Sequence, residues 1–173
     1  MKNNFFTFLI IIVLSASCSK APDLNLVSKH NIGLLTDSTQ VKDLQLVFPS
    51  DSIVTLNEGN EFTGTNNDIE VYEKSGKKLL TLTPKQILDS SSTIKSIQIH
   101  NERYKTAKGI NTKSTFKSIK DNYKISSIQN TLRNIVVSVN EINAFFTIDK
   151  NELPAELRFD MNLKIEAIQI PDG

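Results

Sequence analysis

The sequence KGINTKSTFKSIKDNY, residues 108–123, decides the fold because an earlier stretch, NIGLLTDSTQVKDLQLVF at residues 31–48, repeats its pattern. Both stretches place a glycine beside an isoleucine, continue with threonines and serines, and end in apolar residues at helical spacing that finish in an aromatic residue. Threonine and serine are favoured at the start of a helix because their side-chain oxygens accept hydrogen bonds from its first amides. The sequence therefore predicts one short helix in each stretch.

The two expected helices have the same kind of apolar face. In the later stretch Ser114 is the expected cap, and in the earlier one Asp37 or Ser38 takes that place, while Pro49 ends the helix. The two faces are Val41, Leu44 and Phe48 in the earlier helix, and Phe116, Ile119 and Tyr123 in the later one.

Short alternating segments after each helix predict antiparallel strands. After the first helix we expect a strand at 53–56, a loop or weak strand at 57–68, a hairpin of 69–71 with 79–82 around Ser75–Gly76, a helical turn at 84–88 and a strand at 94–99. After the second helix we expect strands at 125–128, 134–139, 144–148 and 164–170, with a turn at 140–143.

The two halves align as divergent copies of one unit. Superposing Val41 on Phe116 also superposes Leu44 on Ile119, Phe48 on Tyr123 and Ile53 on Ile128, and residues 82–99 lie over residues 153–170 without a gap. The spacing differs between these two alignments, so chance similarity is the alternative. A copy of this size is small for a separate domain, so we expect two pseudo-repeats, 26–100 and 103–171, that share one core in a single domain, 26–173. The predicted fold is mainly β, bordering on α+β, and sandwich-like.

The first 20 residues, MKNNFFTFLIIIVLSASCSK, have the layout of a bacterial export signal. Lys2 precedes an apolar run at residues 5–14, which is shorter than the roughly 20 residues that a membrane span needs. Cys18 is the only cysteine and follows small residues, which predicts a lipoprotein signal peptide at 1–17, lipidation of Cys18 and a tether at 18–25. The alternative is an ordinary signal peptide with an incidental cysteine.

Removal of the leader balances the charge of the chain. The mature protein would carry 19 basic side chains (20 minus Lys2) and 19 acidic ones. This balance argues against binding to nucleic acid and against attachment to a membrane by charge. Membrane contact is expected through the lipid on Cys18. Ser19 and Lys20 differ from the aspartate that retains lipoproteins at the inner membrane, so the outer membrane is the expected location.

Few residues suggest catalysis or metal binding. The chain has two histidines, His30 and His100, which are expected to be ordinary surface or hydrogen-bonded side chains. The alternative is a two-histidine metal site, if the two copies bring them together. The carboxylate pairs Asp68 with Glu70 and Asp149 with Glu152 could act as acid and base, but we expect them to be solvated loop charges. Neither a nucleophile elbow nor a phosphate-binding glycine loop is present. We therefore predict no cofactor, no metal and no catalytic residue.

A row of lysines accompanies the second helix. Lys113, Lys117, Lys120 and Lys124 follow helical spacing beside its apolar face. Such lysines commonly cover apolar surface with their stems while the charged ends stay in water. The alternative is contact with an anionic partner at the membrane surface.

The order of these features resembles a known family. The leader is followed by IGLLTDST at residues 32–39, a hairpin, an isoleucine-rich strand and TAKGINTKSTF at residues 106–116. This order resembles the RpoE-regulated envelope lipoproteins of the YfeY type, although the cysteine pair and tryptophans of that family are absent here. The resemblance implies an outer-membrane, predominantly β lipoprotein and supplies no catalytic residues. A weaker likeness is to the tandem helix-plus-sheet proteins of the β-lactamase-inhibitor and SmpA/OmlA kind.

The sequence thus predicts a non-enzymatic envelope lipoprotein whose β body binds another envelope component, a protein or a glycan. A carrier or sensor of an apolar or anionic small molecule, held between the sheets, is the second hypothesis, and an enzyme of unknown type is the third. The chain closes on Pro171, Asp172 and Gly173, residues typical of turns, so a further strand beyond Gly173 is as well supported as a natural terminus.

Overall fold

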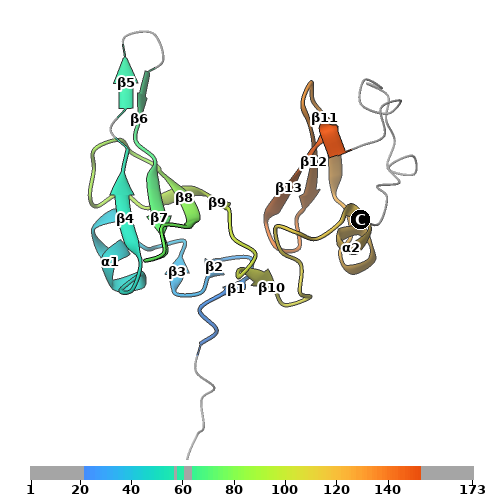
Figure 1. The fold of residues 1–173 in the computed structure, drawn as a ribbon, viewed down its shortest axis with the longest axis horizontal. Coiled ribbons are helices and arrows are strands. Elements are labelled where there is room, and N and C mark those ends of the chain that lie inside the picture. Colours follow the sequence, from blue (N-terminus) through green and yellow to red (C-terminus); the bar gives the residue numbers. More distant parts are fainter. Residues whose placement is uncertain (1–21, 57, 61–63, 153–173) are drawn as a thin grey trace, which may run out of the picture.

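The computed structural model describes residues 22–56, 58–60 and 64–152, and it confirms the mainly β fold. Two lobes stand side by side above a small sheet (Figure 1). We call α1 with the sheet β4-β7-β8-β9 the first lobe, and α2 with the sheet β11-β12-β13 the second lobe. The small sheet has the order β10-β1-β2-β3, and β5 and β6 form a two-stranded ribbon.

The two helices and most of the strands after them follow the predicted order, whereas the short strands at 31–32, 35–36 and 105–106 were not predicted. The first half contains β1 (Leu26–Val27), β2 (Asn31–Ile32), β3 (Leu35–Thr36), a 3-10 turn (Val41–Asp43), α1 (Leu44–Val47), β4 (Ser52–Thr55), β5 (Glu58–Asn60), β6 (Gly64–Asn66), β7 (Ile69–Tyr72), β8 (Lys78–Pro84) and β9 (Ile94–Ile99). The second half contains β10 (Lys105–Thr106), α2 (Phe116–Asn122), β11 (Ser127–Asn130), β12 (Asn134–Val139), β13 (Ala144–Asp149) and a final 3-10 turn (Lys150–Glu152).

In each lobe a short helix is followed by strands that pair antiparallel. In the first lobe Ile53 pairs with Val71, which pairs with Leu80. In the second lobe Ile128 pairs with Val137, which pairs with Phe146. The sequence alignment places Ile53 on Ile128, but its gap-free part places Leu82 of β8 on residue 153, after β13, so these registers do not test the predicted repeat. The exact limits of the copies stay a prediction.

The expectation of one shared core is wrong for the described residues. Their buried apolar side chains form two clusters, one for each lobe. In the first cluster the fully buried Val71 and Leu80 pack with Leu44 of α1, and β2 and β3 of the small sheet contribute Ile32 and Leu35. In the second cluster Ile135, Val137 and Val139 of β12 pack with Phe116 and Ile119 of α2. Each short helix covers the apolar face of its own sheet, so each lobe has its own interior.

Both helices start differently from the prediction, although their apolar faces are buried as expected apart from Val41, which is partly buried. Neither Asp37 nor Ser38 caps the first helical segment, which has no side-chain cap. In the second helix Thr115, not Ser114, is the cap, because its Oγ1 accepts from Ser118 N at 3.1 Å.

The first amides of the first helical segment donate instead to the loop before β9: Val41 N donates to Ser92 O and Lys42 N donates to Ser90 O, each at 2.9 Å. The loop before β9 thus supplies the carbonyls that satisfy the start of the first helical segment, and no side-chain cap is needed. In the second helix Ser114 Oγ is engaged elsewhere, because it accepts from Asn111 N at 3.0 Å.

Three other local predictions need correction. Pro84 belongs to β8, and residues 85–88 form a bend and a turn with Leu88 at a φ of 59°, so the predicted helical turn is absent from this described stretch. The strand predicted at 125–128 begins two residues later, as β11. The connection between β7 and β8 is longer than the predicted two-residue turn: residues 73–77 separate the strands, Gly76 N donates to Glu73 O, and Gly76 has a φ of 85°. The strand predicted at 164–170 lies outside the described residues.

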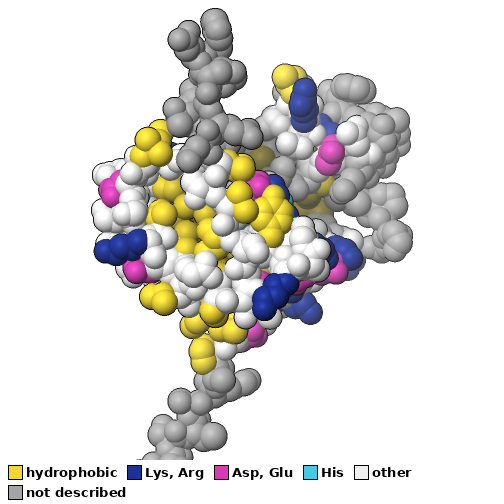
Figure 2. Space-filling view, turned by 60° about the vertical axis from the view of Figure 1, so that its left-hand side comes forward, with side chains coloured by type: hydrophobic (Ala, Val, Ile, Leu, Met, Phe, Trp, Pro, Cys, Tyr) yellow, Lys and Arg dark blue, Asp and Glu magenta, His cyan; other side chains and the backbone are white. Residues whose placement is uncertain are grey.

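Figure 2 turns the left-hand side of Figure 1 toward the viewer. Apolar side chains gather at the middle of this face of the first lobe, and charged side chains lie around its rim (Figure 2). Among the described helices, none is long and apolar enough to cross a membrane.

Candidate functional site

A cleft of about 820 Å³ lies between the two lobes. Its walls include β9 from the first lobe and β13 from the second, and its base includes β2, β3 and residues between Tyr104 and Ser114. Figure 1 shows β9 and β13 on the sides of the lobes that are turned toward each other. The volume falls within the range of about 300–1,000 Å³ that is usual for ligand-binding pockets.

The two walls turn strand edges to the cleft. Every residue of 94–99 and of 144–148 lines it, whereas β8 contributes only Thr81 and Thr83. A strand that presents one face to a cavity lines it with alternate residues, because successive side chains point to opposite faces. The unbroken runs therefore indicate that β9 and β13 present their edges, with backbone groups accessible from the cleft.

The charges around the cleft are balanced. Its charged lining residues are two lysines, Lys29 and Lys95, and two aspartates, Asp37 and Asp68. Apolar side chains from both lobes also contribute, among them Ile97 and Phe145, and Phe145 is 70% exposed. A ligand with both apolar and polar groups matches this lining better than a strongly anionic one.

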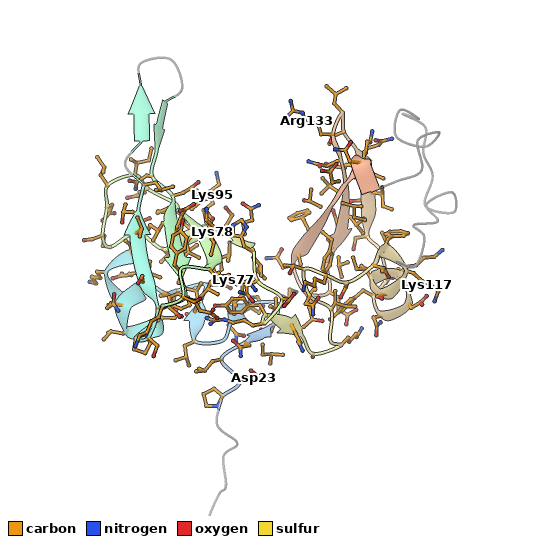
Figure 3. All side chains as sticks on the ribbon, viewed as in Figure 1. Asp23, Lys77, Lys78, Lys95, Lys117 and Arg133 are labelled. Carbon is orange, nitrogen blue, oxygen red and sulfur yellow. The ribbon has the colours of Figure 1, made fainter. Side chains whose placement is uncertain are left out.

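A polar cluster on the first lobe adjoins the cleft wall. The buried carboxylate of Glu70 accepts hydrogen bonds from Lys78 Nζ and from the Tyr72 hydroxyl. The bond from Lys78, followed by that from Tyr72, lowers the pKa of Glu70, and the same carboxylate raises the pKa of Lys78. In Figure 3, Lys77, Lys78 and Lys95 lie on the side of the first lobe that is turned toward the second.

The structure does not bring the two histidines together. His30 Nδ1 lies 2.8 Å from Asp37 Oδ2, and His100 Nε2 lies 2.9 Å from Thr81 Oγ1. Burial, followed by the charge of Lys78, lowers the pKa of His100. Within the described ranges, no group of three or more histidine, cysteine or acidic side chains could hold a metal ion.

The carboxylate pairs that the sequence suggested are separately engaged. Asp68 Oδ1 accepts from Thr83 Oγ1 at 2.7 Å, while Glu70 is held by Lys78 and Tyr72. Asp149 Oδ1 accepts from Asn151 N at 2.8 Å. These bonds give Asp68, Glu70 and Asp149 local structural roles.

The predicted lysine row is not one continuous helical stripe. Lys117 and Lys120 belong to α2, whereas Lys113 precedes the helix and Lys124 follows it. Lys113 forms an ion pair with Glu102, and Lys117 forms one with Asp121 at 2.7 Å. Lys117 points away from the first lobe (Figure 3). Contact of these lysines with an anionic partner stays a prediction.

Sequence reasoning overlooked Lys108, which belongs to the opening stretch. Its Nζ donates to Asn122 O at 2.8 Å and to Glu141 Oε1 at 2.9 Å, and it lies 4.2 Å from the centroid of the Tyr123 ring. A cation at the end of a helix is favourable because the last carbonyls carry partial negative charge. Glu141 is 33 residues away, so no local pattern indicated the pair.

Cys18 lies outside the described residues, so its lipidation stays a prediction. The chain matches no protein-family model, no curated protein and no solved structure.

Proposed function

We propose that this protein is a non-enzymatic envelope lipoprotein, anchored through Cys18 at the outer membrane, that binds another envelope component in the cleft between its lobes. The leader sequence and the resemblance to envelope lipoproteins of the YfeY type support the location. The observation that carries the binding role is the cleft itself, because both lobes line it and both turn strand edges toward it.

A carrier of a small ligand is the second candidate. The size of the cleft and its isoleucines, such as Ile97 and Ile99, favour an apolar molecule, whereas the balanced charges give no support to an anionic one. Native mass spectrometry of the protein released gently from membranes distinguishes the candidates. A bound small molecule supports the carrier, and a bound protein or glycan supports the leading proposal.

Site-specific photocrosslinking in cells tests the binding role. In the test variant a photoreactive residue replaces Gln98, which is exposed and lines the cleft. In the matched control it replaces Leu46 of α1, which is 78% exposed and does not line the cleft. We expect a discrete crosslinked product from position 98 and none from position 46. The same products from both positions, or none from position 98, would contradict a cleft-binding role.

The anchor has its own test. In the Cys18→Ser variant the protein should move from the membrane fraction to the soluble fraction after export. Retention of this variant in the membrane would contradict lipid anchoring through Cys18.

A further inference from the structure

The backbone of β9 has hydrogen-bonding groups that point away from β8. His100 N donates to Leu79 O at 2.9 Å, so residues 79 and 100 form a hydrogen-bonded pair. Hydrogen-bonded and non-hydrogen-bonded pairs alternate along an antiparallel ladder. Thr81 with Gln98 is therefore again a bonded pair, whereas Leu80 with Ile99 and Leu82 with Ile97 are not.

It follows that the N–H and C=O groups of Ile97 and Ile99 are directed to the outer edge of the sheet. In the described part of the chain, β9 is the last strand of its sheet, and no strand pairs with this edge. Both residues line the cleft. An edge with open backbone groups is a template for pairing with another strand.

We propose that the outer edge of β9 binds an extended polypeptide segment of a partner protein as an additional strand of the first lobe's sheet. This inference rests on the proposed binding function of the cleft and specifies its occupant. Main-chain hydrogen bonds to Ile97 and Ile99 provide the affinity, as in other cases of strand addition to a sheet edge.

The setting of the edge favours a single strand over a second sheet. The edge opens into the cleft, and β13 lines the other side of the same space. A single extended segment can enter between two walls more readily than the edge of a whole domain. At the start of β9 the register shifts between Thr83 and Pro84, and Lys95 is exposed there, which are two features that discourage pairing. Pairing is therefore confined to residues 96–99.

The surroundings also define the side chains of the partner. Ile97 and Ile99 pack against the first core cluster, while Ser96 and Gln98 are exposed and pair with Thr83 and Thr81. A strand beside β9 would place alternate side chains next to these two sets. The partner segment should therefore alternate apolar and polar residues.

A labelled peptide with the sequence KLLTLTP tests the inference. This sequence is that of β8, which alternates in the required way and already pairs with the inner edge of β9. Fluorescence anisotropy with the full chain measures its affinity. Two further peptides carry N-methyl groups on alternate backbone amides, one set in each peptide, so the protein itself stays unaltered.

We expect one N-methylated peptide to bind at least tenfold more weakly than the parent and the other to bind within about twofold, because only one set of amides faces β9. Saturation with the parent peptide should also slow amide hydrogen exchange at Ile97 and Ile99. Equal effects of the two methylated peptides, absence of binding, or unchanged exchange at these amides would overturn the inference.

The chain's own C-terminal residues are the alternative occupant. If the amides of Ile97 and Ile99 are protected in the free full chain and lose protection when the chain ends at residue 152, the partner-strand proposal is overturned. A crosslink from position 98 would still support binding in the cleft. The failure of the strand proposal is thereby distinct from the failure of the proposed function.

Discussion

Replacement of Gly33 by alanine should weaken the contact between the N-terminal segment and the small sheet. Gly33 has a φ of 55°, a backbone conformation that side chains other than glycine rarely adopt. A Cβ atom at this position would lie 2.2 Å from Leu24 O and 2.8 Å from Leu24 C. Both contacts are with backbone, so the segment before β1 must move.

The expected loss is the sum of two effects. A left-handed backbone costs an alanine about 1–2 kcal/mol. Relief of the overlap adds about 1–3 kcal/mol, the usual cost of overpacking. Gly33→Ala should therefore lower the free energy of unfolding by about 2–5 kcal/mol, a large part of the total for a typical domain.

Gly109, in the stretch 108–123, provides a matched control. Its φ is 80°, and a Cβ atom built there has no neighbour within 4 Å. Gly109→Ala should therefore cost only the conformational part, about 1–2 kcal/mol. Denaturation in urea, followed by circular dichroism, measures both variants. Equal losses in the two variants would refute the reasoning, because the overlap with Leu24 would then have no effect.

Three further predictions concern the cores, a carboxylate and a helix cap. Leu80→Ala should lower the free energy of unfolding by about 2–5 kcal/mol because Leu80 is fully buried. Leu46→Ala, at an exposed position, should change it by less than about 0.5 kcal/mol, and urea denaturation measures both variants. The hydrogen bond from Lys78 lowers the pKa of Glu70 in the folded protein below its usual 4.5. The ionised carboxylate therefore stabilises the fold above pH 4.5, and this stabilisation is lost as the pH falls from 4.5 through the lowered pKa of the folded state. The stability difference between the wild type and Glu70→Gln should accordingly shrink below pH 4.5, and a constant difference down to pH 3 would contradict it. Thr115→Ala should cost about 1 kcal/mol in thermal or urea unfolding and Thr115→Ser much less, since serine retains the hydroxyl that accepts from Ser118 N.

The apolar pattern predicted the elements well because burial and spacing depend on local sequence. Phe116, Ile119 and Tyr123 are buried as the helical spacing requires, and β12 has the predicted limits. The helix starts were less predictable, because several neighbouring residues can act as caps. Thr115 takes the role instead of Ser114, and distant carbonyls from the loop before β9 replace a cap at the first helix.

The cleft could not be predicted from the sequence. Its existence depends on two cores that form separately, whereas the repeat alone suggested that the copies share one. The free edge of β9 could not be predicted either. The pattern of Ile94, Ile97 and Ile99 predicts a half-buried strand, but it does not show which edge of the strand is hydrogen-bonded to a neighbour. The Glu70–Lys78 contact spans the turn between β7 and β8, and it became visible only with the register of that hairpin.

The short strand β1 has a mechanical consequence. It pairs in parallel with β10 and antiparallel with β2, and Lys105 N also donates to Asn25 O at 3.0 Å. Because β1 is the first strand along the described chain, a pull on the N-terminal segment reaches this joint before it reaches either core. Any tension on the N-terminal segment would therefore be applied directly to the seam that connects the two halves of the molecule.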